Sequence, residues 1–421
     1  MDLKTAVLKG LPDDNGLYMP TSIPSLSPSF ISNIKDYSLA EIGYEVCKTL
    51  FDGYIGAQDL QGIIERSITF PAPIVSLNER IHVLELFHGP SMAFKDFGAR
   101  FMAQLMGHFN KDEDELLTIL VATSGDTGGA VAAGFLNTPG IEVVILYPSG
   151  KVSDIQEMQL TTLGANIRAL EVDGTFDDCQ ALVKQAFLDK ALTKRKRLAS
   201  ANSINIARLI PQSFYYFEAY KQLEDHSLDT VFSIPSGNFG NLTAGVIAQR
   251  MGLPVSKFLA ATNVNDIIPS YLKTGEYSPR ASQRTVSNAM DVGDPSNYKR
   301  LADIFRHEGS TWNNMKEMIQ GYAYTDVQTT DGVKDIYTRF GYTMDPHGAI
   351  GFLALEEYAK GKDINGVILE TAHYAKFKDT MDSTLGFATE TPSRLKELLH
   401  KNKDAIKIGV DYEGFLAQLG G

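Results

Sequence analysis

A repeated unit of strand, turn and helix, beginning near residue 79, constrains the fold more than any other feature of this sequence. Short apolar runs typical of buried strands occupy residues 80–87, 116–122, 141–148, 229–237 and 257–263. Turns and segments with helical spacing follow several of these runs, including helices expected from Ser153 and from Thr175. Strands that alternate with helices in this way predict parallel sheets with helices on both faces, which is an α/β fold.

Three other parts of the chain have a different character. Residues 1–78 combine turns with two helical stretches, 39–53 and 57–68, and are expected to form an N-terminal helical cap. Residues 264–345 contain many chain breakers, so we expect an irregular insertion or covering subdomain there. For the end of the chain we expect a helix at 348–361, a strand at 364–371 and a terminal helix from Ser393.

Composition argues against several classes of function. The chain has 39 basic and 51 acidic residues, and the resulting net charge of −12 argues against a nucleic-acid-binding surface. With only Cys47 and Cys179 and no HxxxH or HExxH spacing, neither a disulfide framework nor a metal site is expected. The N-terminus has no signal-peptide pattern, and no stretch approaches the ~20 apolar residues of a membrane span, so we expect a cytoplasmic protein.

Lys95 is the strongest candidate for a catalytic residue. It lies in the stretch HGPSMAFKDF (88–97), between Phe94 and Phe97, at the expected start of a helix. Aromatic neighbours remove hydration from the ammonium group and the helix dipole disfavours it, so we expect a lowered pKa. A neutral amine is what a Schiff base with an aldehyde cofactor requires. The alternative is a lysine whose stem only covers apolar surface while its ammonium group reaches water.

Two glycine-rich loops follow predicted strands and open predicted helices. They have the sequences TSGDTGG (123–129) and SGNFGN (236–241). In this position, backbone N–H groups and the helix dipole hold anions. Neither loop has the P-loop pattern or the G-x-G-x-x-G pattern of dinucleotide-binding proteins. Each loop by itself is also compatible with an ordinary tight turn.

Two further segments supply candidate polar ligands. Thr371 ends a predicted strand, where ligands of open parallel sheets bind, and it offers a neutral hydroxyl to a ring nitrogen. His373 follows, with a satisfied buried histidine as the alternative. Asn202 and Arg208 lie in NSINIARLIPQ (202–212). The guanidinium of Arg208 suits a phosphate or carboxylate, although such an arginine more often forms a surface salt bridge.

At these residues the sequence resembles the threonine synthase family, in its longer branch of enterobacterial and fungal enzymes. The resemblance extends over nearly the whole chain and rests on the motifs GLYMP, FPAPIV (70–75), LELFHGPSMAFKDFGARFMAQLM, ATSGDTGGAVA, VVILYPSGKVS, SANSINIAR, PSGNFGNLTAG, AATNVND, NAMDVGDPSN, MDPHGA and ETAHYAKF. It implies a fold-type II pyridoxal-phosphate enzyme, similar to the β subunit of tryptophan synthase. The expected division is an N-terminal segment (1–78), a smaller α/β domain (101–200) and a larger cofactor-binding α/β domain (79–100 and 201–421).

The resemblance also implies a role for each candidate residue. Lys95 is expected to form the Schiff base with pyridoxal 5′-phosphate, and Thr371 to face the pyridine nitrogen. The loop expected to hold the cofactor phosphate consists of Gly237, Asn238, Phe239 and Gly240. The loop expected to meet the cofactor ring and the amino-acid end of the substrate contains Thr123, Ser124, Asp126 and Thr127. Asn202 and Arg208 are the expected ligands of the substrate phosphate.

The implied reaction converts O-phospho-L-homoserine and water into L-threonine and phosphate, in a monomer or homodimer without a metal. The alternatives are a phospho-lyase or an amino-acid dehydratase on the same fold, or a protein that binds the cofactor without catalysis. This branch of the family has Asp126 where many fold-type II enzymes have asparagine beside the phenolic oxygen of the cofactor. Members of the family also usually carry a short segment before the stretch that matches residues 3–20.

Overall fold

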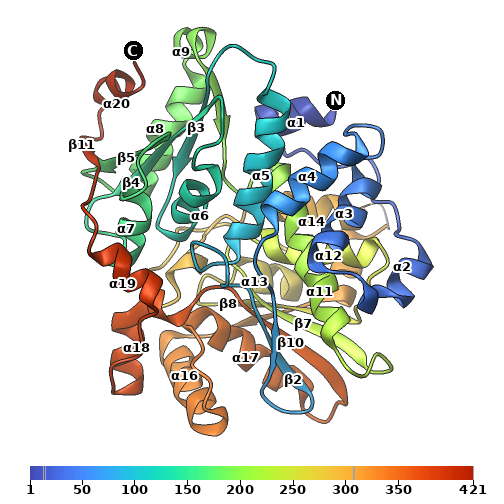
Figure 1. The fold of residues 1–421 in the computed structure, drawn as a ribbon. Coiled ribbons are helices and arrows are strands. Elements are labelled where there is room, and N and C mark those ends of the chain that lie inside the picture. Colours follow the sequence, from blue (N-terminus) through green and yellow to red (C-terminus); the bar gives the residue numbers. More distant parts are fainter. Residues whose placement is uncertain (13, 15, 307–308, 421) are drawn as a thin grey trace.

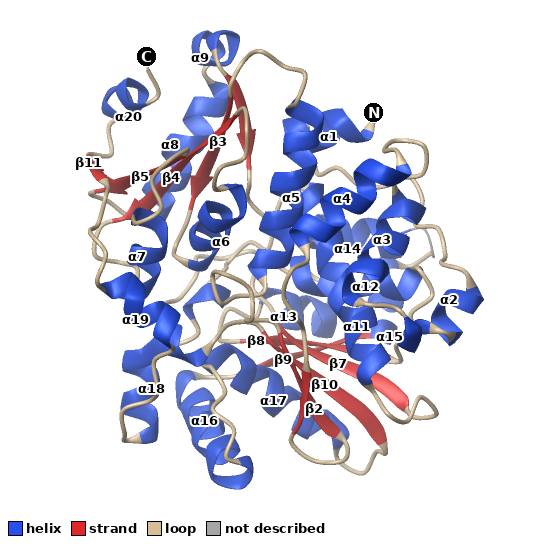
Figure 2. Cartoon of the chain, viewed as in Figure 1, coloured by secondary structure: helices blue, strands red, loops and turns tan. Residues whose placement is uncertain are grey.

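Two sheets organise the structure, and helices cover both faces of each (Figure 1 and Figure 2). The computed structural model describes residues 1–12, 14, 16–306 and 309–420. The larger sheet has the spatial order β1 (Ile74–Ser76), β2 (Ile81–Glu85), β10 (Ile364–Glu370), β7 (Asp229–Pro235), β8 (Lys257–Thr262) and β9 (Ile319–Ala323). Neighbouring strands in it are parallel except for β1 and β2, which pair antiparallel.

The smaller sheet is parallel throughout. Its order is β11 (Ile406–Ile408), β5 (Ile167–Val172), β4 (Ile141–Pro148), β3 (Leu117–Ala122) and β6 (Arg197–Ser200). Because β11 comes from the end of the chain, the C-terminal residues return to this sheet. The domain division expected from the sequence remains a prediction, and a division by sheets would move β11 from the larger domain to the smaller one.

The strands are apolar on both sides because helices bury both faces of each sheet. Successive strand residues point to opposite faces, and the packing follows this alternation. In β3, Ile119 and Val121 belong to the main apolar cluster, whereas Leu120 and Ala122 belong to a separate cluster. In β10, Leu369 lies in the main cluster, while its neighbour Ile368 lies in the cluster beneath the helix 346–359.

The helices form three groups. The N-terminal group is α1 (Leu3–Lys9), α2 (Pro28–Ser32), α3 (Leu39–Leu50) and α4 (Ala57–Ser67). The helices around the smaller sheet are α6 (Asp126–Phe135), α7 (Asp154–Thr161), α8 (Phe176–Leu188), α9 (Lys190–Arg195), α19 (Ser393–Leu399) and α20 (Tyr412–Gln418). Those around the larger sheet are α10 (Ile206–Leu209), α11 (Phe214–Gln222), α12 (Gly240–Arg250), α13 (Ile267–Thr274), α14 (Tyr298–Arg306), α15 (Thr311–Met318), α16 (Asp326–Phe340), α17 (Pro346–Ala359) and α18 (Lys378–Leu385). The long helix α5 (Lys95–Asn110) packs against α4, α6 and α10 and so joins all three groups.

Local capping explains where several predicted helices begin. Ser153 and Gln156 form a capping box at the start of α7, as the sequence predicted. Thr175 and Asp178 do the same for α8. The two helices expected in the N-terminal segment are confirmed as α3 and α4.

The expectation for residues 264–345 was wrong in part. This segment contains α13, α14, α15 and α16, and its strand β9 is the edge strand of the larger sheet. Helix α16 packs against α17 and does not belong to a separate covering subdomain. The irregular part is 275–297, apart from the 3₁₀ turn η3 (Asn288–Met290).

The strand order gathers the predicted site residues at the carboxyl ends of the strands. In the larger sheet β2, β10 and β7 are neighbours, and they lead to Lys95, to Thr371 and to the loop 236–240. In the smaller sheet β3 and β6 are neighbours, and they lead to the loop 123–126 and to Asn202. None of the helices in the described part of the chain has the length and apolar character that crossing a membrane requires.

Candidate active site

Lys95 is the first residue of α5, which confirms the predicted position at a helix N-terminus. The turn before it is tied to the end of β10, because the Phe94 N–H donates to the carbonyl of Thr371 at 2.8 Å and Ala93 bridges Ala372. No side chain caps this helix end. The strand pairing of β2 with β10 therefore fixes where the lysine starts its helix.

The Lys95 side chain is mostly buried, with 18% of its surface exposed. Its Nζ lies 4.7 Å from the centre of the Phe94 ring and 3.8 Å from Oδ2 of Asp126. Burial lowers the pKa of Lys95, the Asp126 carboxylate opposes this change, and the nearby cation of Lys376 adds to it. The Phe97 ring does not lie against the Lys95 amine as the Phe94 ring does, because it packs into the core against Phe70 and Tyr215.

Asp126 opens α6 and is the anion nearest to the Lys95 amine. Its Oδ1 accepts hydrogen bonds from Gln156 Nε2 at 2.9 Å and lies 2.7 Å from Lys376 Nζ. Burial by itself raises the pKa of Asp126, but the cations of Lys376 and Lys95 outweigh this effect and hold the pKa well below its usual range. The carboxylate is therefore ionised beside Lys95.

The first glycine loop is shaped by Thr123. Its Oγ1 accepts hydrogen bonds from the N–H groups of Gly125 at 3.0 Å and Gly128 at 2.9 Å. This buried hydroxyl therefore supplies a hydrogen-bond acceptor to backbone N–H groups at the start of α6, which have no acceptor within the helix. Of its neighbours, Ser124 is exposed and Thr127 is half-buried, so their side chains are accessible to a ligand. A direct contact between Thr123 and substrate stays a prediction.

The second glycine loop has the backbone shape of an anion cradle. Phe239 adopts the left-handed conformation with φ of 59° and precedes α12, which no side chain caps. A Cβ on Gly237 would lie 2.8 Å from Cα of Met290, so the loop passes close to another backbone segment. The Asn238 side chain contacts the same segment, 290–296, because its Oδ1 accepts from the N–H of Ser296 at 3.0 Å.

Asn297 and Arg300 lie beside this loop and were not identified from the sequence. Arg300 Nη1 donates to Asn297 Oδ1 at 2.8 Å, which fixes the amide so that Nδ2 is the free donor. That buried Nδ2 has no hydrogen-bond partner among the described residues, and it lies 3.5 Å from where a Cβ on Gly240 would be. Asn297 lies in the motif NAMDVGDPSN, one of those that carry the family resemblance.

Thr371 lies at the end of β10, as predicted. Its carbonyl accepts from the N–H of Phe94, its hydroxyl has no hydrogen-bond partner among the described residues, and the residue is 7% exposed. His373 is half-buried, and its Nδ1 accepts from the N–H of Ala375 at 3.1 Å, so a structural role as in the alternative interpretation accounts for this contact. Burial lowers the pKa of His373 to about 4, so this ring is neutral at pH 7.

Asn202 and Arg208 are the remaining predicted site residues. Arg208 is 4% exposed and donates from Nη1 to the carbonyl of Ala201 at 2.6 Å, and its buried Nε has no partner among the described residues. Burial lowers the pKa of Arg208 to about 10, so the guanidinium stays charged at pH 7. The buried Oδ1 of Asn202 is also without a partner in the described part of the chain.

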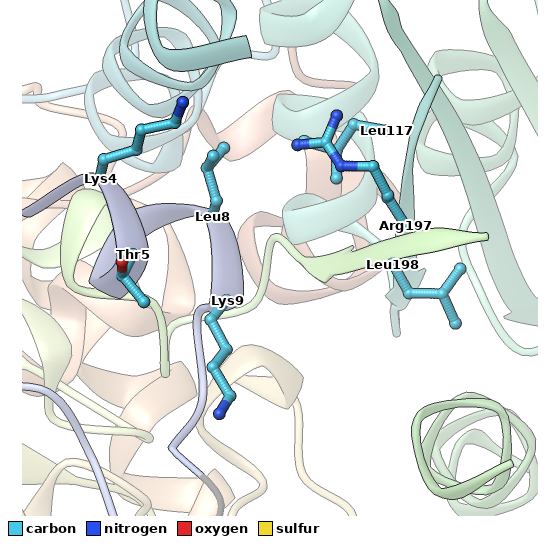
Figure 3. Close-up of a pocket in the computed structure, with 7 residues that line it drawn as sticks. All are labelled: Lys4, Thr5, Leu8, Lys9, Leu117, Arg197 and Leu198. Atoms are coloured by element: carbon cyan, nitrogen blue, oxygen red, sulfur yellow. The ribbon is translucent and has the colours of Figure 1, made fainter. Parts of the chain in front are cut away.

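A surface pocket of about 370 Å³ lies at the opposite ends of the strands (Figure 3). It is lined by Lys4, Thr5, Leu8, Lys9, Leu117, Arg197 and Leu198, from α1 and the amino ends of β3 and β6. Lys4 pairs with Glu113 at 3.0 Å, and Arg197 donates to Asn110 at 2.9 Å. This pocket contains none of the predicted site residues.

Family models match the chain from end to end. They are described as threonine synthase N terminus (residues 1–68), pyridoxal-phosphate dependent enzyme (64–369) and threonine synthase, C-terminal (348–415). The chain belongs to the threonine synthase family. Its relatives include the threonine synthases of Haemophilus influenzae, 44% identical over 98% of this chain and 94% of that one, and of Escherichia coli, 44% identical over 93% and 90%.

Solved structures of threonine synthases are similar over the same extent. The Escherichia coli structure has a TM-score of 0.92 at 41% identity, and the structure with bound pyridoxal phosphate from Brucella melitensis has 0.94 at 33%. Each comparison covers 100% of this chain and 96% of the other. The predicted family, the fold-type II architecture and the cofactor pyridoxal phosphate are confirmed, and the protein is a threonine synthase, a lyase that depends on this cofactor.

The residues of this threonine synthase fit that cofactor. The loop 237–240, the uncapped start of α12 and the free amide of Asn297 together suit a phosphate group. Lys95 offers an amine of lowered pKa, and Thr371, at the adjacent strand end, a hydroxyl that has no hydrogen-bond partner in the described part of the chain. Among the described residues, no cluster of three or more His, Cys, Asp or Glu side chains could hold a metal ion.

Proposed function

We propose that this threonine synthase converts O-phospho-L-homoserine and water into L-threonine and phosphate, with Lys95 as the residue that binds the cofactor and moves protons. The observation that supports this role most directly is the position of Lys95. Its amine is mostly buried at the meeting point of the strand ends, 3.8 Å from an ionised carboxylate and beside two further cations. A surface lysine covering apolar residues would show none of these contacts.

The remaining cofactor ligands that we propose are those that the sequence indicated. The loop of Gly237, Asn238, Phe239 and Gly240 would hold the cofactor phosphate, and the free amide of Asn297 would contribute a further hydrogen bond. Thr371 would offer a neutral hydroxyl to the ring nitrogen, and Asp126 would act on the cofactor ring from the start of α6. When bound, pyridoxal phosphate supplies an electron sink that stabilises negative charge developing on the substrate.

The reaction requires several proton movements that the chain must arrange. Protons leave Cα and Cβ of the substrate, phosphate departs from Cγ, water adds at Cβ, and protons return to Cα and Cγ. We assign the proton at Cα to Lys95 Nζ, since burial lowers the pKa of this amine and so favours its neutral form. Neighbouring Asp126 balances the charge when Nζ holds that proton.

The substrate phosphate is assigned to Arg208 and Asn202. Arg208 keeps its charge in a buried position, and its unpartnered Nε is a hydrogen-bond donor to an anion. A charged donor of this kind also stabilises the departing phosphate. Ser124 and Thr127, with accessible side chains, are assigned to the amino-acid end of the substrate, and Thr123 keeps the loop in shape.

The decisive test is Lys95→Ala. We expect formation of threonine to fall at least about a thousandfold, since the variant has no amine to bond to the cofactor. The circular dichroism spectrum should remain that of the wild type. Borohydride reduction of the wild-type protein followed by mass spectrometry should find the pyridoxyl group on the peptide that contains Lys95.

Two outcomes would contradict this assignment. Substantial threonine formation by Lys95→Ala would exclude the lysine as the essential base. Release of phosphate with a keto acid and ammonia, without threonine, would identify the wild-type protein as a phospho-lyase. The cytoplasmic location, the monomeric or homodimeric state and the absence of a nucleic-acid partner remain predictions from the sequence.

A further inference from the structure

Lys376 is a buried lysine beside the active site that the assignments above leave without a role. It lies in the short 3₁₀ helix η4 (Tyr374–Phe377), and its side chain has 0% of its surface exposed. Its Nζ lies 2.7 Å from Asp126 Oδ1 and donates to the carbonyl of Ser91 at 2.8 Å. Lysine is almost never buried to this extent unless it is paired, so the partner Asp126 is the reason that it is tolerated here.

Asp126 divides its two oxygens between two lysines. Oδ1 receives Lys376 at 2.7 Å and Gln156 Nε2 at 2.9 Å, both at hydrogen-bond distance. Oδ2 is 3.8 Å from Lys95 Nζ, which is too long for a hydrogen bond. The carboxylate is thus anchored through Oδ1, while Oδ2 stays at ion-pair distance from Lys95 without a hydrogen bond to it.

The charges that act on Lys95 come from four elements. They are Asp126 at the start of α6, Lys376 in η4, Arg208 in α10 and Asp345 before α17. The two carboxylates favour the ammonium form of Lys95, and the two cations disfavour it. Loss of Lys376 would remove one repulsion and would also free Asp126 to approach Lys95, so both consequences favour the ammonium form.

We propose that Lys376 is a positioning residue: by holding Asp126 Oδ1 it keeps Asp126 from closing to hydrogen-bond distance of Lys95 and so leaves the Lys95 amine free to bond to the cofactor. This inference rests on the proposed role of Lys95. The bond in question forms when neutral Nζ attacks the aldehyde carbon of pyridoxal phosphate. A carbon–nitrogen double bond replaces the carbon–oxygen double bond, both amine hydrogens and the aldehyde oxygen leave as water, and nothing is oxidised or reduced.

The test follows this bond formation in the cofactor-free protein across a range of pH. Pyridoxal 5′-phosphate is mixed with the protein, and the rate of covalent capture is read from visible absorbance. The site is then verified by borohydride reduction and mass spectrometry. For Lys376→Met we expect the midpoint of the pH–rate curve to rise by about one unit, so that capture at pH 7 slows about tenfold.

Three companion variants sharpen the experiment. Lys376→Arg retains a cation able to reach Asp126, so its midpoint should stay near that of the wild type. Asp126→Asn removes the carboxylate and should move the midpoint in the opposite direction, downward. Lys378→Met is the matched control, because Lys378 lies two residues away, pairs with Asp382 at 2.8 Å and has no contact with Asp126. Its midpoint should not change.

An unchanged midpoint in a folded Lys376→Met protein would overturn the inference, as would equal shifts for Lys376→Met and Lys378→Met. If Lys376→Met shows no thermal unfolding transition, Lys376→Gln is measured by the same criteria, since its amide keeps a donor for the Ser91 carbonyl without the charge. Failure of the wild-type protein to acquire the pyridoxyl group at Lys95 would instead refute the proposed function. The two failures are therefore distinguishable.

Discussion

Two adjacent residues, Lys95 and Asp96, face different surroundings although both are buried. Lys95 reaches the site, whereas the Asp96 carboxyl group turns under the preceding loop, where its Oδ2 accepts from the N–H of Ser91 at 2.9 Å. Its Oδ1 has no partner among the described residues, and the side chain fills the space above Gly89. Burial therefore raises the pKa of Asp96 to about 6.

This raised pKa predicts how stability depends on pH. Between pH 4 and 6 the folded protein binds a proton at Asp96 that the unfolded chain does not, so Asp96 makes the unfolding free energy fall as pH rises through this window. The contribution amounts to roughly 3 kcal/mol at most, because each unit of pKa shift corresponds to about 1.4 kcal/mol. In Asp96→Asn, the unfolding free energy at pH 7 minus that at pH 4, measured by denaturant titration, should be more positive than in the wild type by this amount.

Asp382 provides a control of opposite sign. Its hydrogen bond with Lys378, aided by the N–H of Thr389, lowers the pKa of Asp382 to about 2, so the stability that it contributes is lost only as pH falls below about 4. Asp382→Asn should leave the change between pH 4 and 7 as in the wild type. If the unfolding free energy of Asp96→Asn changed with pH between 4 and 7 as it does in the wild type, groups other than Asp96 would be the cause of that change.

At the scale of elements, the loop before α12 depends on the absence of a side chain at Gly237. A Cβ there would lie 2.8 Å from Cα of Met290 and 2.9 Å from the carbonyl oxygen of Ala289, and backbone atoms cannot yield as a flexible side chain can. Any larger residue must therefore separate this loop from the segment that contains Asn297. The cradle proposed for the cofactor phosphate consists of both parts.

For Gly237→Ala we expect the dissociation constant for pyridoxal 5′-phosphate to rise at least about tenfold, since at least one phosphate hydrogen bond, worth roughly 1.4 kcal/mol or more, is lost. Titration of the cofactor-free protein, followed by fluorescence, measures this value. Gly56→Ala is a suitable control because a Cβ at Gly56 meets only Oδ2 of Asp59, at 3.8 Å. Wild-type affinity in Gly237→Ala would exclude the close approach as a requirement for binding.

The elements that the sequence predicted are those with a strong local signal. Fully buried strands such as β3 and β4 read as apolar runs, and the capping box of Ser153 and Gln156 marks α7. β11 is a three-residue strand with two exposed side chains, and β6 directly follows a basic run, so neither has a buried pattern to recognise. They become strands only because a neighbouring strand is already in place.

The same distinction, between features with a local sequence signal and features that depend on distant contacts, applies to the candidate active site. Lys95, Thr371 and the glycine loops could be identified because each stands at a strand end beside a recognisable motif. The contact of Lys376 with Asp126 could not, because it depends on the pairing of distant segments and on the direction of two side chains. The free amide of Asn297 likewise depends on Arg300 holding the other end of that amide.

At the scale of the whole molecule, Arg300 joins three distant segments. It is 1% exposed and donates to the carbonyls of Tyr18 in the N-terminal segment and of Ser203 and Ile204 in the loop that carries Asn202. Its hydrogen-bond acceptors are carbonyl and amide oxygens, so it is a buried cation without a carboxylate partner among the described residues. Burial accordingly lowers the pKa of Arg300 to about 9.

Arg300→Met should lower the unfolding free energy by at least about 3 kcal/mol, because several buried carbonyl groups lose their hydrogen bonds at roughly 1–3 kcal/mol each. Thermal unfolding monitored by circular dichroism provides the measurement. Arg306→Met, in the same helix α14, is the matched control, since the Arg306 side chain is 67% exposed. A loss of stability equal to that of the control would show that Arg300 does not hold the segments together.

The contact between Lys376 and the carbonyl of Ser91 spans 285 residues of sequence, and it has a consequence for biosynthesis. A ribosome makes Lys95 early, when β2 has only β1 beside it and the strand that orders the lysine turn does not yet exist. The turn acquires its partners Thr371 and Lys376 only when nearly nine-tenths of the chain has been translated. A prematurely terminated chain would thus carry the cofactor-binding lysine without the environment that activates it, and would leave the cellular supply of cofactor untouched.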